Sequence, residues 1–457
     1  MKTKRTRIQI WLICAAMLQA ATSGAQPVTQ IATGSTGEHS LFLKSDGSLW
    51  GMGYNYDGQL GDGTSNTDFP YGTNQPQLII ASNVTAIAGG YGHSLFLKSD
   101  GSLWAMGDND FGQLGDGTFN SGTNFPEQVV ASNVIAIAGG YFHSLFLKSD
   151  GSLWAMGDNR RGQLGDGTYN LITNQPEQIV ASNVTAIAAG DWHSLFLKND
   201  GSLWAMGFDL FGELGDGTYN GTNRPEQIVA SGVTAIAGGE EFSLLLKTNG
   251  SLWAMGANNV GQLGDGTYSG ILTGVNKPEQ IVASGVAAIA AGGGHSLFLK
   301  NDNSLWAMGN NYYGQLGDGS YNSTNQPEQI VTSGVTAITA GYGHSLFLKS
   351  DGSLWAMGDN FNGELGDGTL NNTNRPEQIV VNASYNQISD KLLGCTNMQL
   401  SFVGIAGVNY ALDRSSSLSP PNWIPQATNP AGSFGALVFT NPPDATSNNF
   451  WRIRSVP

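Results

Sequence analysis

The sequence predicts an all-β protein whose repeats close into a seven-bladed β-propeller. Glycine accounts for 64 of the 457 residues, and so much glycine works against helix interiors. The hydrophobic fraction of 40% and the 11 Trp residues exclude a disordered chain. The phrase H-S-L-F-L-K-S-D-G-S-L-W-A-M-G recurs seven times with small variations. Together these observations favour many short strands and tight turns arranged in an array.

The repeat is about 50 residues long, which is the length typical of a propeller blade. A unit of this size cannot bury its own apolar faces and must pack against its neighbours. The tryptophan of the phrase marks the seven copies: Trp50, Trp104, Trp154, Trp204, Trp253, Trp306 and Trp355.

Each unit predicts four short strands. In the second copy the first three are residues 84–88, 94–98 and 102–106, and Asp100-Gly101 between the last two is a two-residue hairpin turn. A fourth strand follows the third copy at residues 176–180. The second and third strands are apolar on both faces, which fits a blade covered on both sides.

Loop lengths predict how the ring closes. Only three residues, 181–183, separate a fourth strand from the next first strand, so we expect a hairpin within one blade. Some twenty residues precede each fourth strand, enough to cross to the next blade. The spare strand at residues 376–381 should therefore pair with the first blade, which removes exposed sheet edges.

The two ends depart from the repeat. Residues 1–25 are typical of a secretory signal, with an apolar run at 8–21, a small-residue cleavage site, and the basic residues Lys2, Lys4, Arg5 and Arg7. The apolar run is shorter than the roughly 20 residues that a membrane-spanning helix needs. Removal of the signal changes the net charge to −15 − 4 = −19 and leaves Cys395 as the only thiol, so no intramolecular disulfide can form.

We therefore expect three parts: the signal at residues 1–25, the propeller at 26–383 and a small β domain at 384–457. Apolar runs at 399–403, 410–412, 436–439 and 450–453 suggest that the last part is a β-sandwich. It could attach the propeller to the cell surface or serve as a second binding module.

The motif G-Q-L-G-D-G-T at residues 58–64, 112–118 and 162–168, with the start G-G-x-x-H-S at 89–94, resembles the regulator of chromosome condensation repeat family. The resemblance covers about residues 28–382 and implies a seven-bladed propeller. Members include a nuclear exchange factor for a small GTPase, modules of ubiquitin ligases, a plant ultraviolet receptor and secreted bacterial inhibitors of β-lactamase. Export and acidity argue against the nuclear role, and the secreted inhibitors match the expected compartment.

Two sets of repeated residues invite a metal-site hypothesis, and for both we expect a structural role instead. Six copies carry a histidine where the fifth has Phe242, and we expect each histidine to bond a backbone group at a blade edge: His39, His93, His143, His193, His295 and His344. We expect seven turn aspartates to accept backbone N–H bonds: Asp62, Asp116, Asp166, Asp216, Asp265, Asp318 and Asp367.

The copies differ mainly at two positions in each repeat: the two residues before G-[QE]-L-G and the two before the histidine. Both sets are rich in the aromatic and arginine residues that dominate interface hot spots. We expect equivalent loops to emerge on one side and form one aromatic partner-binding surface: Tyr56, Tyr91, Phe111, Tyr141, Phe142, Arg160, Arg161, Trp192, Phe211, Tyr312, Tyr313, Tyr342 and Phe361. Neutral drift of exposed loops is the alternative.

These features predict an exported, monomeric binding scaffold, secreted or held at the cell surface or in the periplasm. No catalytic motif is present, so we expect no enzyme activity and no cofactor or metal. The net charge of −15 argues against nucleic acid as a partner. A protein partner is expected, with a polysaccharide-binding surface module or a secreted enzyme inhibitor as alternatives.

Overall fold

The computed structural model describes residues 26–169, 172–270 and 273–379 in full, and six strands of the tail by their backbone. Every regular element in these parts is a β-strand. The chain divides into two compact units, of which Pro27–Val380 is the ring and Val381–Pro457 contains the tail. The predicted signal segment lies outside the described residues.

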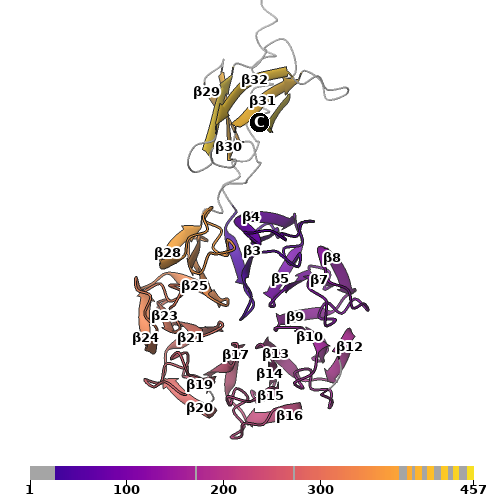
Figure 1. The fold of residues 1–457 in the computed structure, drawn as a ribbon, viewed down its shortest axis with the longest axis vertical. Coiled ribbons are helices and arrows are strands. Elements are labelled where there is room, and N and C mark those ends of the chain that lie inside the picture. Colours follow the sequence, from indigo (N-terminus) through magenta and orange to yellow (C-terminus); the bar gives the residue numbers. More distant parts are fainter. Residues whose placement is uncertain are drawn as a thin grey trace, which may run out of the picture. The chain divides into compact units, whose positions relative to one another are not determined.

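The ring consists of seven antiparallel four-stranded sheets (Figure 1). The first strands of the blades lie innermost and contact one another around the axis. They are β1 (Val28–Ala32), β5 (Val84–Gly89), β9 (Val134–Gly139), β13 (Val184–Ala189), β17 (Val233–Gly238), β21 (Val286–Ala291) and β25 (Val335–Ala340). The second strands are β2 (His39–Lys44), β6 (His93–Lys98), β10 (His143–Lys148), β14 (His193–Lys198), β18 (Phe242–Lys247), β22 (His295–Lys300) and β26 (His344–Lys349).

The outer half of each blade holds the third and fourth strands. The third strands are β3 (Leu49–Tyr54), β7 (Leu103–Gly107), β11 (Leu153–Asp158), β15 (Leu203–Gly207), β19 (Leu252–Ala257), β23 (Leu305–Gly309) and β27 (Leu354–Gly358). The fourth strands form the rim: β4 (Gly72–Ile80), β8 (Thr123–Val130), β12 (Ile172–Val180), β16 (Thr222–Val229), β20 (Gly274–Val282), β24 (Thr324–Val331) and β28 (Thr373–Ile379). The all-β, seven-bladed prediction is confirmed.

The predicted closure by a C-terminal strand on the first blade is wrong. β28 pairs with β27 of its own blade, and the first blade is completed by β4. The three-residue link 81–83 runs from the rim strand of one blade to the inner strand of the next. Four Cα steps of about 3.5 Å reach about 14 Å, which equals three strand spacings of about 4.8 Å. A short link can therefore cross a whole blade, and it does not require a hairpin.

The ring closes through packing and loop contacts. β1 packs against β25 and β26 of the seventh blade. The long loop before β28 lies on the first blade, where the Gly368 amide donates to the Asn74 carbonyl at 2.8 Å and the Asn74 side chain donates to the Gly368 carbonyl at 2.9 Å. Equivalent loops join every other pair of neighbours, as with Gly63 and Asn124. The long loop is thus the device that joins blades.

The cores lie between neighbouring blades. Leu95 and Leu103 of the second blade pack with Phe146 and Met156 of the third, and all four are fully buried. The repeated tryptophan is only half-buried, with a lysine ammonium above its ring at 3.6 to 4.0 Å from the centroid in all seven copies. Apolar residues on both faces of the second and third strands are therefore explained by blade-to-blade burial.

The seven turn aspartates do what the sequence predicts. Each accepts a hydrogen bond from the backbone amide two residues later, as Asp116 does from Thr118 at 2.8 Å. In six of the blades the residue that caps this loop is an asparagine, such as Asn109, whose side chain accepts from the Leu114 amide. The loops are rigid turns held by their own side chains.

The tail strands form two three-stranded antiparallel sheets, β29-β30-β33 and β32-β31-β34. Their bounds are β29 (Ser389–Leu393), β30 (Asn397–Val403), β31 (Asn409–Ser415), β32 (Ile424–Pro430), β33 (Ala436–Asn441) and β34 (Phe450–Val456). All four predicted apolar runs fall in strands, whereas the sequence reading missed β29 and β32. The side chains that would form a sandwich core lie outside the described residues.

Candidate binding face

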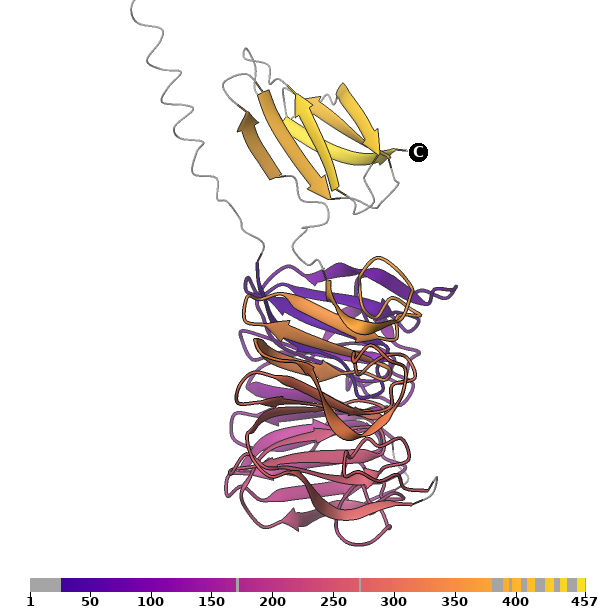
Figure 2. The ribbon, with the colours of Figure 1, turned by 90° about the vertical axis from the view of Figure 1, so that its left-hand side faces the viewer.

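The two variable sets leave the same side of the ring. The first set follows each third strand and the second precedes each second strand, and these antiparallel neighbours have those ends together. Seen edge-on in Figure 2, the long loops before the fourth strands lie along the right-hand side of the ring. We call this side the loop face, defined by the two variable pairs of all seven repeats.

The two sets interlock between neighbouring blades. Phe111 of the second repeat stacks on Phe142 of the third, with ring centroids 4.4 Å apart. Asn362 of the last repeat donates to a Glu38 carboxylate oxygen of the first at 3.1 Å. The loop face is thus built from contacts between the first set of one repeat and the second set of the next.

Blades two to four carry a continuous aromatic arc, defined as Tyr91, Phe111, Tyr141, Phe142 and Trp192. Tyr141 stacks on Tyr91 at 4.2 Å and on Trp192 at 5.1 Å between ring centroids. Phe142 meets Tyr141 edge-on at 4.3 Å. All five side chains are half-buried, because each ring covers its neighbour.

Arg160 caps this arc. Its guanidinium lies 4.5 Å from the Phe111 ring centroid and donates two hydrogen bonds of 2.9 Å to the carboxylate of Asp158. Arg161 lies instead over Phe208, at 5.0 Å. The Arg160–Asp158 contact is the ion pair found among the residues that the structure describes. The chain therefore holds a cation between an aromatic ring and a carboxylate on this face.

A second aromatic group joins the first and last blades. Phe361 contacts Phe69 at 4.9 Å, and Tyr56 meets Tyr71 edge-on at 6.0 Å. Phe69 and Tyr71 were missed by the sequence reading, although both are exposed, at 55% and 37%. They lie in the four extra residues that lengthen the first repeat spacing to 54 from Trp50 to Trp104, a signal that could have revealed them.

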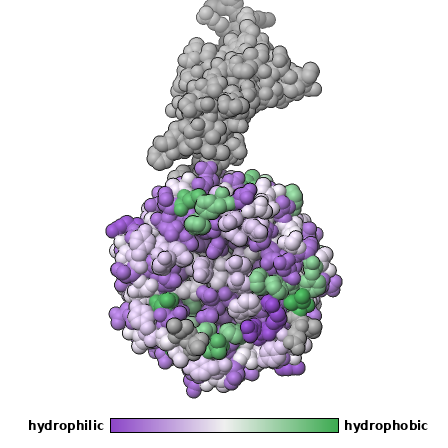
Figure 3. Space-filling view, in the orientation of Figure 1, coloured by the Kyte–Doolittle hydropathy of each residue, from purple (hydrophilic) through white to green (hydrophobic). Residues whose placement is uncertain are grey.

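The remaining predicted residues separate into exposed and buried. Tyr312 is 73% exposed and meets Tyr313 edge-on, and Tyr342 is 39% exposed. Phe211 is only 8% exposed, so its prediction as a surface residue is wrong. The loop face consequently carries separate aromatic groups instead of one aromatic surface. Figure 3 likewise shows hydrophobic residues in separate patches on a hydrophilic face.

Carboxylates gather near the axis on the loop face. Asp191 is buried and accepts a hydrogen bond of 2.8 Å from the Thr36 hydroxyl across the ring. Burial, and next the charge of Glu240, raise the pKa of Asp191 well above its usual range. Burial also raises the pKa of Glu240 to about 7, with a further contribution from Glu241. Ionisation of the Asp191 and Glu240 carboxyl groups is therefore disfavoured.

A cavity of ≈ 170 Å³ lies on the loop face between blades five, six and seven. Its lining includes Glu240 and Glu241, the Gly293-Gly294 pair, Tyr313 and Tyr342. Both variable sets contribute to it. The sixth repeat has glycine at both positions of the second variable set, whereas each other repeat has at most one.

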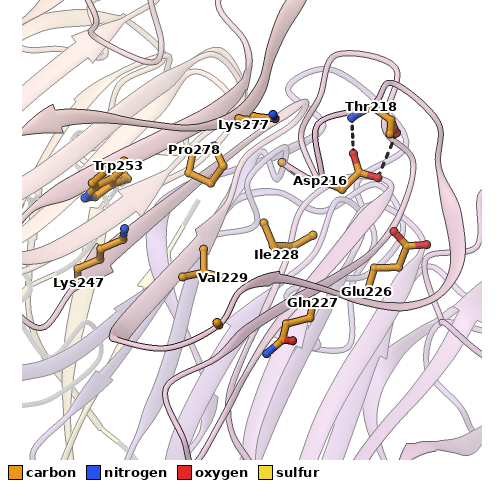
Figure 4. A pocket seen from close by; sticks show the side chains of 12 residues that line it. Asp216, Thr218, Glu226, Gln227, Ile228, Val229, Lys247, Trp253, Lys277 and Pro278 are labelled. Atoms are coloured by element: carbon orange, nitrogen blue, oxygen red, sulfur yellow. Dashed lines mark hydrogen bonds between the residues drawn. The ribbon is translucent and has the colours of Figure 1, made fainter.

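A larger groove of ≈ 780 Å³ lies between blades four and five at the rim (Figure 4). Asp216, Thr218 and Glu226 line one part, and Lys247, Trp253 and Lys277 another. All of these except Lys277 occupy positions that recur around the ring with the same residue, apart from one serine for threonine and Gln77 for glutamate in the first repeat. The groove reflects the geometry of the scaffold and offers little that is particular to one site.

The histidines join neighbouring blades through side chains. Each donates from Nε2 to the Ser Oγ of the next blade at 2.8 to 3.0 Å, as His143 does to Ser194. The Ser hydroxyl itself donates to a backbone carbonyl, so it accepts the bond from the histidine. Nε2 is therefore the protonated nitrogen. The expected structural role is borne out, but the partner is a serine hydroxyl and not a backbone group. Burial lowers the pKa of His143 to about 3.

No group of three or more His, Cys, Asp or Glu in the described residues is arranged to hold a metal ion. No helix there is long and apolar enough to cross a bilayer.

The fold and the loop face define a repeat propeller with a constant scaffold and variable loops. Residues 126–401, more than half of the chain, match the RCC1-like domain model, and residues 28–59, 84–113, 46–97 and 100–147 match models of the RCC1 repeat. The chain belongs to the RCC1-like domain family.

Curated relatives match over short segments. Protein RCC2 of Mus musculus is 40% identical over 93 residues, which are 20% of this chain and 17% of that protein. The ultraviolet-B receptor UVR8 of Arabidopsis thaliana is 31% identical over 96 residues, 21% of each chain. The matches thus span about a fifth of these relatives.

Solved structures share the fold of the ring. Human WBSCR16 aligns with a TM-score of 0.65 and 24% identity over 75% of this chain and 96% of its own. Prp20p of Saccharomyces cerevisiae aligns with a TM-score of 0.67 and 23% identity over 77% and 90%. Prp20p was studied for its binding to Gsp1p and histones, and yeast RCC1 was solved bound to Kap60. RCC1-like propellers therefore include proteins that bind other proteins.

Proposed function

We propose that this chain is an exported, non-enzymatic scaffold that binds a protein partner through its loop face. The observation that carries the proposal is the interlocking of variable residues from seven otherwise constant repeats on one side of the ring. Aromatic and arginine side chains such as those of the arc supply most of the binding energy in protein interfaces. The relatives that bind proteins support the same class of function.

A protein partner explains the arc better than a sugar does. A sugar stacks on an exposed aromatic ring face. In the arc, the Tyr141 ring instead stacks on Tyr91 and on Trp192, and these contacts cover it. The exposed Tyr312 could stack on a sugar, which keeps a carbohydrate ligand as an outcome to test.

The test is capture of a protein from the medium or envelope of the producing cells by the immobilised mature chain. Tyr141→Ala with Trp192→Ala should abolish capture of a specific band, and Tyr312→Ala with Tyr313→Ala should weaken it. Phe125→Ala is the control, because Phe125 is aromatic and 61% exposed but lies on the rim strand β8. Equal capture by the arc variant and the control would contradict the proposal, as would retention on insoluble polysaccharide that depends on Tyr312.

Export is tested by fractionation with N-terminal sequencing. The secreted or envelope chain should begin near residue 26, since a signal peptidase would remove residues 1–25. Recovery of a chain that starts at Met1 from the cytosol would contradict export.

A further inference from the structure

The cavity between blades five, six and seven has a lining that differs from the rest of the loop face. We call it the Tyr–Glu cavity, defined by Glu240, Glu241, Gly293, Gly294, Tyr313 and Tyr342. Its volume of ≈ 170 Å³ is several times the ~30 Å³ that one water molecule occupies in the liquid. It can therefore admit the end of a long side chain but not a folded segment.

At this cavity the sixth repeat carries two glycines, against which neighbouring side chains pack closely. A Cβ at Gly293 would lie 2.8 Å from both the Tyr342 ring and its carbonyl oxygen, so Tyr342 leans over this glycine. A Cβ at Gly294 would lie 3.3 Å from Val260 and Asn310, so these neighbours also close in. In the third repeat the same two positions are Tyr141 and Phe142, which fill the corresponding space within the arc.

The cavity has two carboxylates that the chain leaves uncompensated. Neither the Glu240 nor the Glu241 carboxylate has a hydrogen bond or an ion pair with any described residue. Asp191 lies close by, since the charge of Glu240 contributes to raising the pKa of Asp191. Burying charge without a counterion is costly, so a cation would be favoured here.

The aromatic walls favour the same kind of ligand. Tyr313 and Tyr342 line the cavity, and cations bind the faces of such rings. The chain provides its own precedent on this face, where Arg160 lies over Phe111 and pairs with Asp158. The Tyr–Glu cavity also combines aromatic rings with carboxylates, but no arginine or lysine of the described chain pairs with its carboxylates.

We propose that the Tyr–Glu cavity binds the side-chain cation of a lysine or arginine presented by the partner. This inference rests on the proposed function and specifies the chemistry of the partner: a segment with an exposed basic residue. The ammonium or guanidinium group would lie between the Glu240 and Glu241 carboxylates, with its alkyl chain against the tyrosine rings.

The pH dependence of binding follows from the same geometry. The titratable groups near Glu240 are Glu241, which contributes to raising the pKa of Glu240, and Asp191, Tyr141 and Tyr342, whose pKa values the charge of Glu240 raises. Burial raises the pKa of Glu240 to about 7, so this carboxyl is protonated at pH 6 and ionised at pH 8. A cation should therefore bind more tightly at pH 8, and its binding at pH 7 should release a proton.

The experiment is calorimetric titration of the purified full-length mature chain at low salt with three capped tripeptides. Lysine, arginine or norleucine stands at the centre, with glycine on both sides. We expect the lysine and arginine peptides to bind at least about tenfold more tightly than the norleucine peptide, because charge-assisted hydrogen bonds are the strong ones. Equal affinity of all three peptides at pH 8 would overturn the proposal.

Variants assign the binding to this cavity. Glu240→Gln with Glu241→Gln should reduce the lysine peptide to the norleucine level and remove the pH dependence. Tyr342→Ala should weaken binding about two- to fivefold, and Tyr342→Phe should retain it, because phenylalanine keeps the ring face. The control Glu177→Gln, on the rim strand β12, should change nothing. Unchanged binding by the double glutamine variant, with an unchanged melting temperature, would also overturn the proposal.

Peptide binding needs no natural partner, so the two proposals can fail separately. If the arc variant loses partner capture while the lysine peptide does not bind, the proposed function stands and the cavity has another role. If the peptide binds but no protein is captured, the cation site stands without a protein partner.

Discussion

The aromatic arc of blades two to four and the Tyr–Glu cavity of blades five to seven occupy equivalent positions on the same scaffold. In the arc, Tyr141 and Phe142 fill the space in front of the second strand, and Arg160 neutralises Asp158. In the cavity, Gly293 and Gly294 provide no side chains, and Glu240 and Glu241 line the same space. The aromatic and charged groups of the arc thus pair with one another. The carboxylates of the cavity have no such partner among the described residues and can pair with a basic ligand.

The difference teaches that two residues in each repeat can change the chemistry of the face without changing the fold. The blade joints beneath are almost constant, with six histidine–serine hydrogen bonds around the ring. The one exception, Phe242, lies in the half that contains the cavity. There an apolar ring replaces the hydrogen bond, and Ser296 keeps only its bond to the Gln262 carbonyl.

The largest expected effect concerns these joints. Phe242→Ala removes a fully buried ring and should lower the free energy of unfolding by about 3–5 kcal/mol. His143→Phe copies the fifth blade into the third; it keeps the volume but loses the 3.0 Å bond to Ser194, at a cost of about 1 kcal/mol. Denaturant unfolding monitored by tryptophan fluorescence measures both. A histidine variant at least as destabilised as Phe242→Ala would show that the joints are held mainly by hydrogen bonds.

An intermediate effect is expected when the cavity is made to resemble the arc. Asn259 occupies the position of Arg160 two repeats earlier and lines the cavity. Asn259→Arg should place a guanidinium near Glu240 and weaken the lysine peptide about tenfold, since the chain then supplies its own cation. Asn259→Gln is the matched control without charge. If Asn259→Arg binds the lysine peptide as tightly as the wild type does, the comparison between the cavity and the arc is wrong.

The smallest effect concerns stability and pH. Folded Glu240 retains its proton up to a pKa of about 7, whereas its ordinary pKa is 4.5, so stability falls as the pH rises between these values. The difference between 4.5 and about 7 corresponds to about 3 kcal/mol at full strength, and solvent screening of this partly exposed carboxyl reduces the effect. Glu240→Gln removes the loss and should raise the free energy of unfolding at pH 8 by about 1 kcal/mol, with little change at pH 4. Unfolding curves at both pH values measure it, and Glu177→Gln serves as the control. A gain that is equal at both pH values would indicate packing instead of charge.

The histidine joints impose the opposite trend. Burial lowers the pKa of His143 to about 3 from its ordinary 6.5, so the stability it contributes is present above pH 6.5 and is lost as the pH falls below that value. The Glu240 comparison is therefore best made between the variant and the wild type at each pH, where the contribution of the joints cancels.

Repetition alone was sufficient to predict the number of blades, the hairpin turns, the bonds of the seven turn aspartates and the positions at which the copies vary. These features depend on local spacing, and seven copies confirm one another. What the repeat could not reveal was which strand a long loop leads to, because a three-residue link is equally compatible with a hairpin and with a step across a blade. The structure pairs β28 with β27, although the loop before β28 packs on the first blade around Asn74.

The loop face shows the same division. Its residues were recognisable from the differences among repeats, but a list of aromatic residues does not say which are covered. Phe211 is buried, Tyr141 is covered by its neighbours and Tyr312 stands free. The cavity is lined by two glycines and by side chains from three consecutive blades, which meet only when these blades pack side by side. Local sequence therefore sets what each blade is, and packing between blades sets what the face can bind.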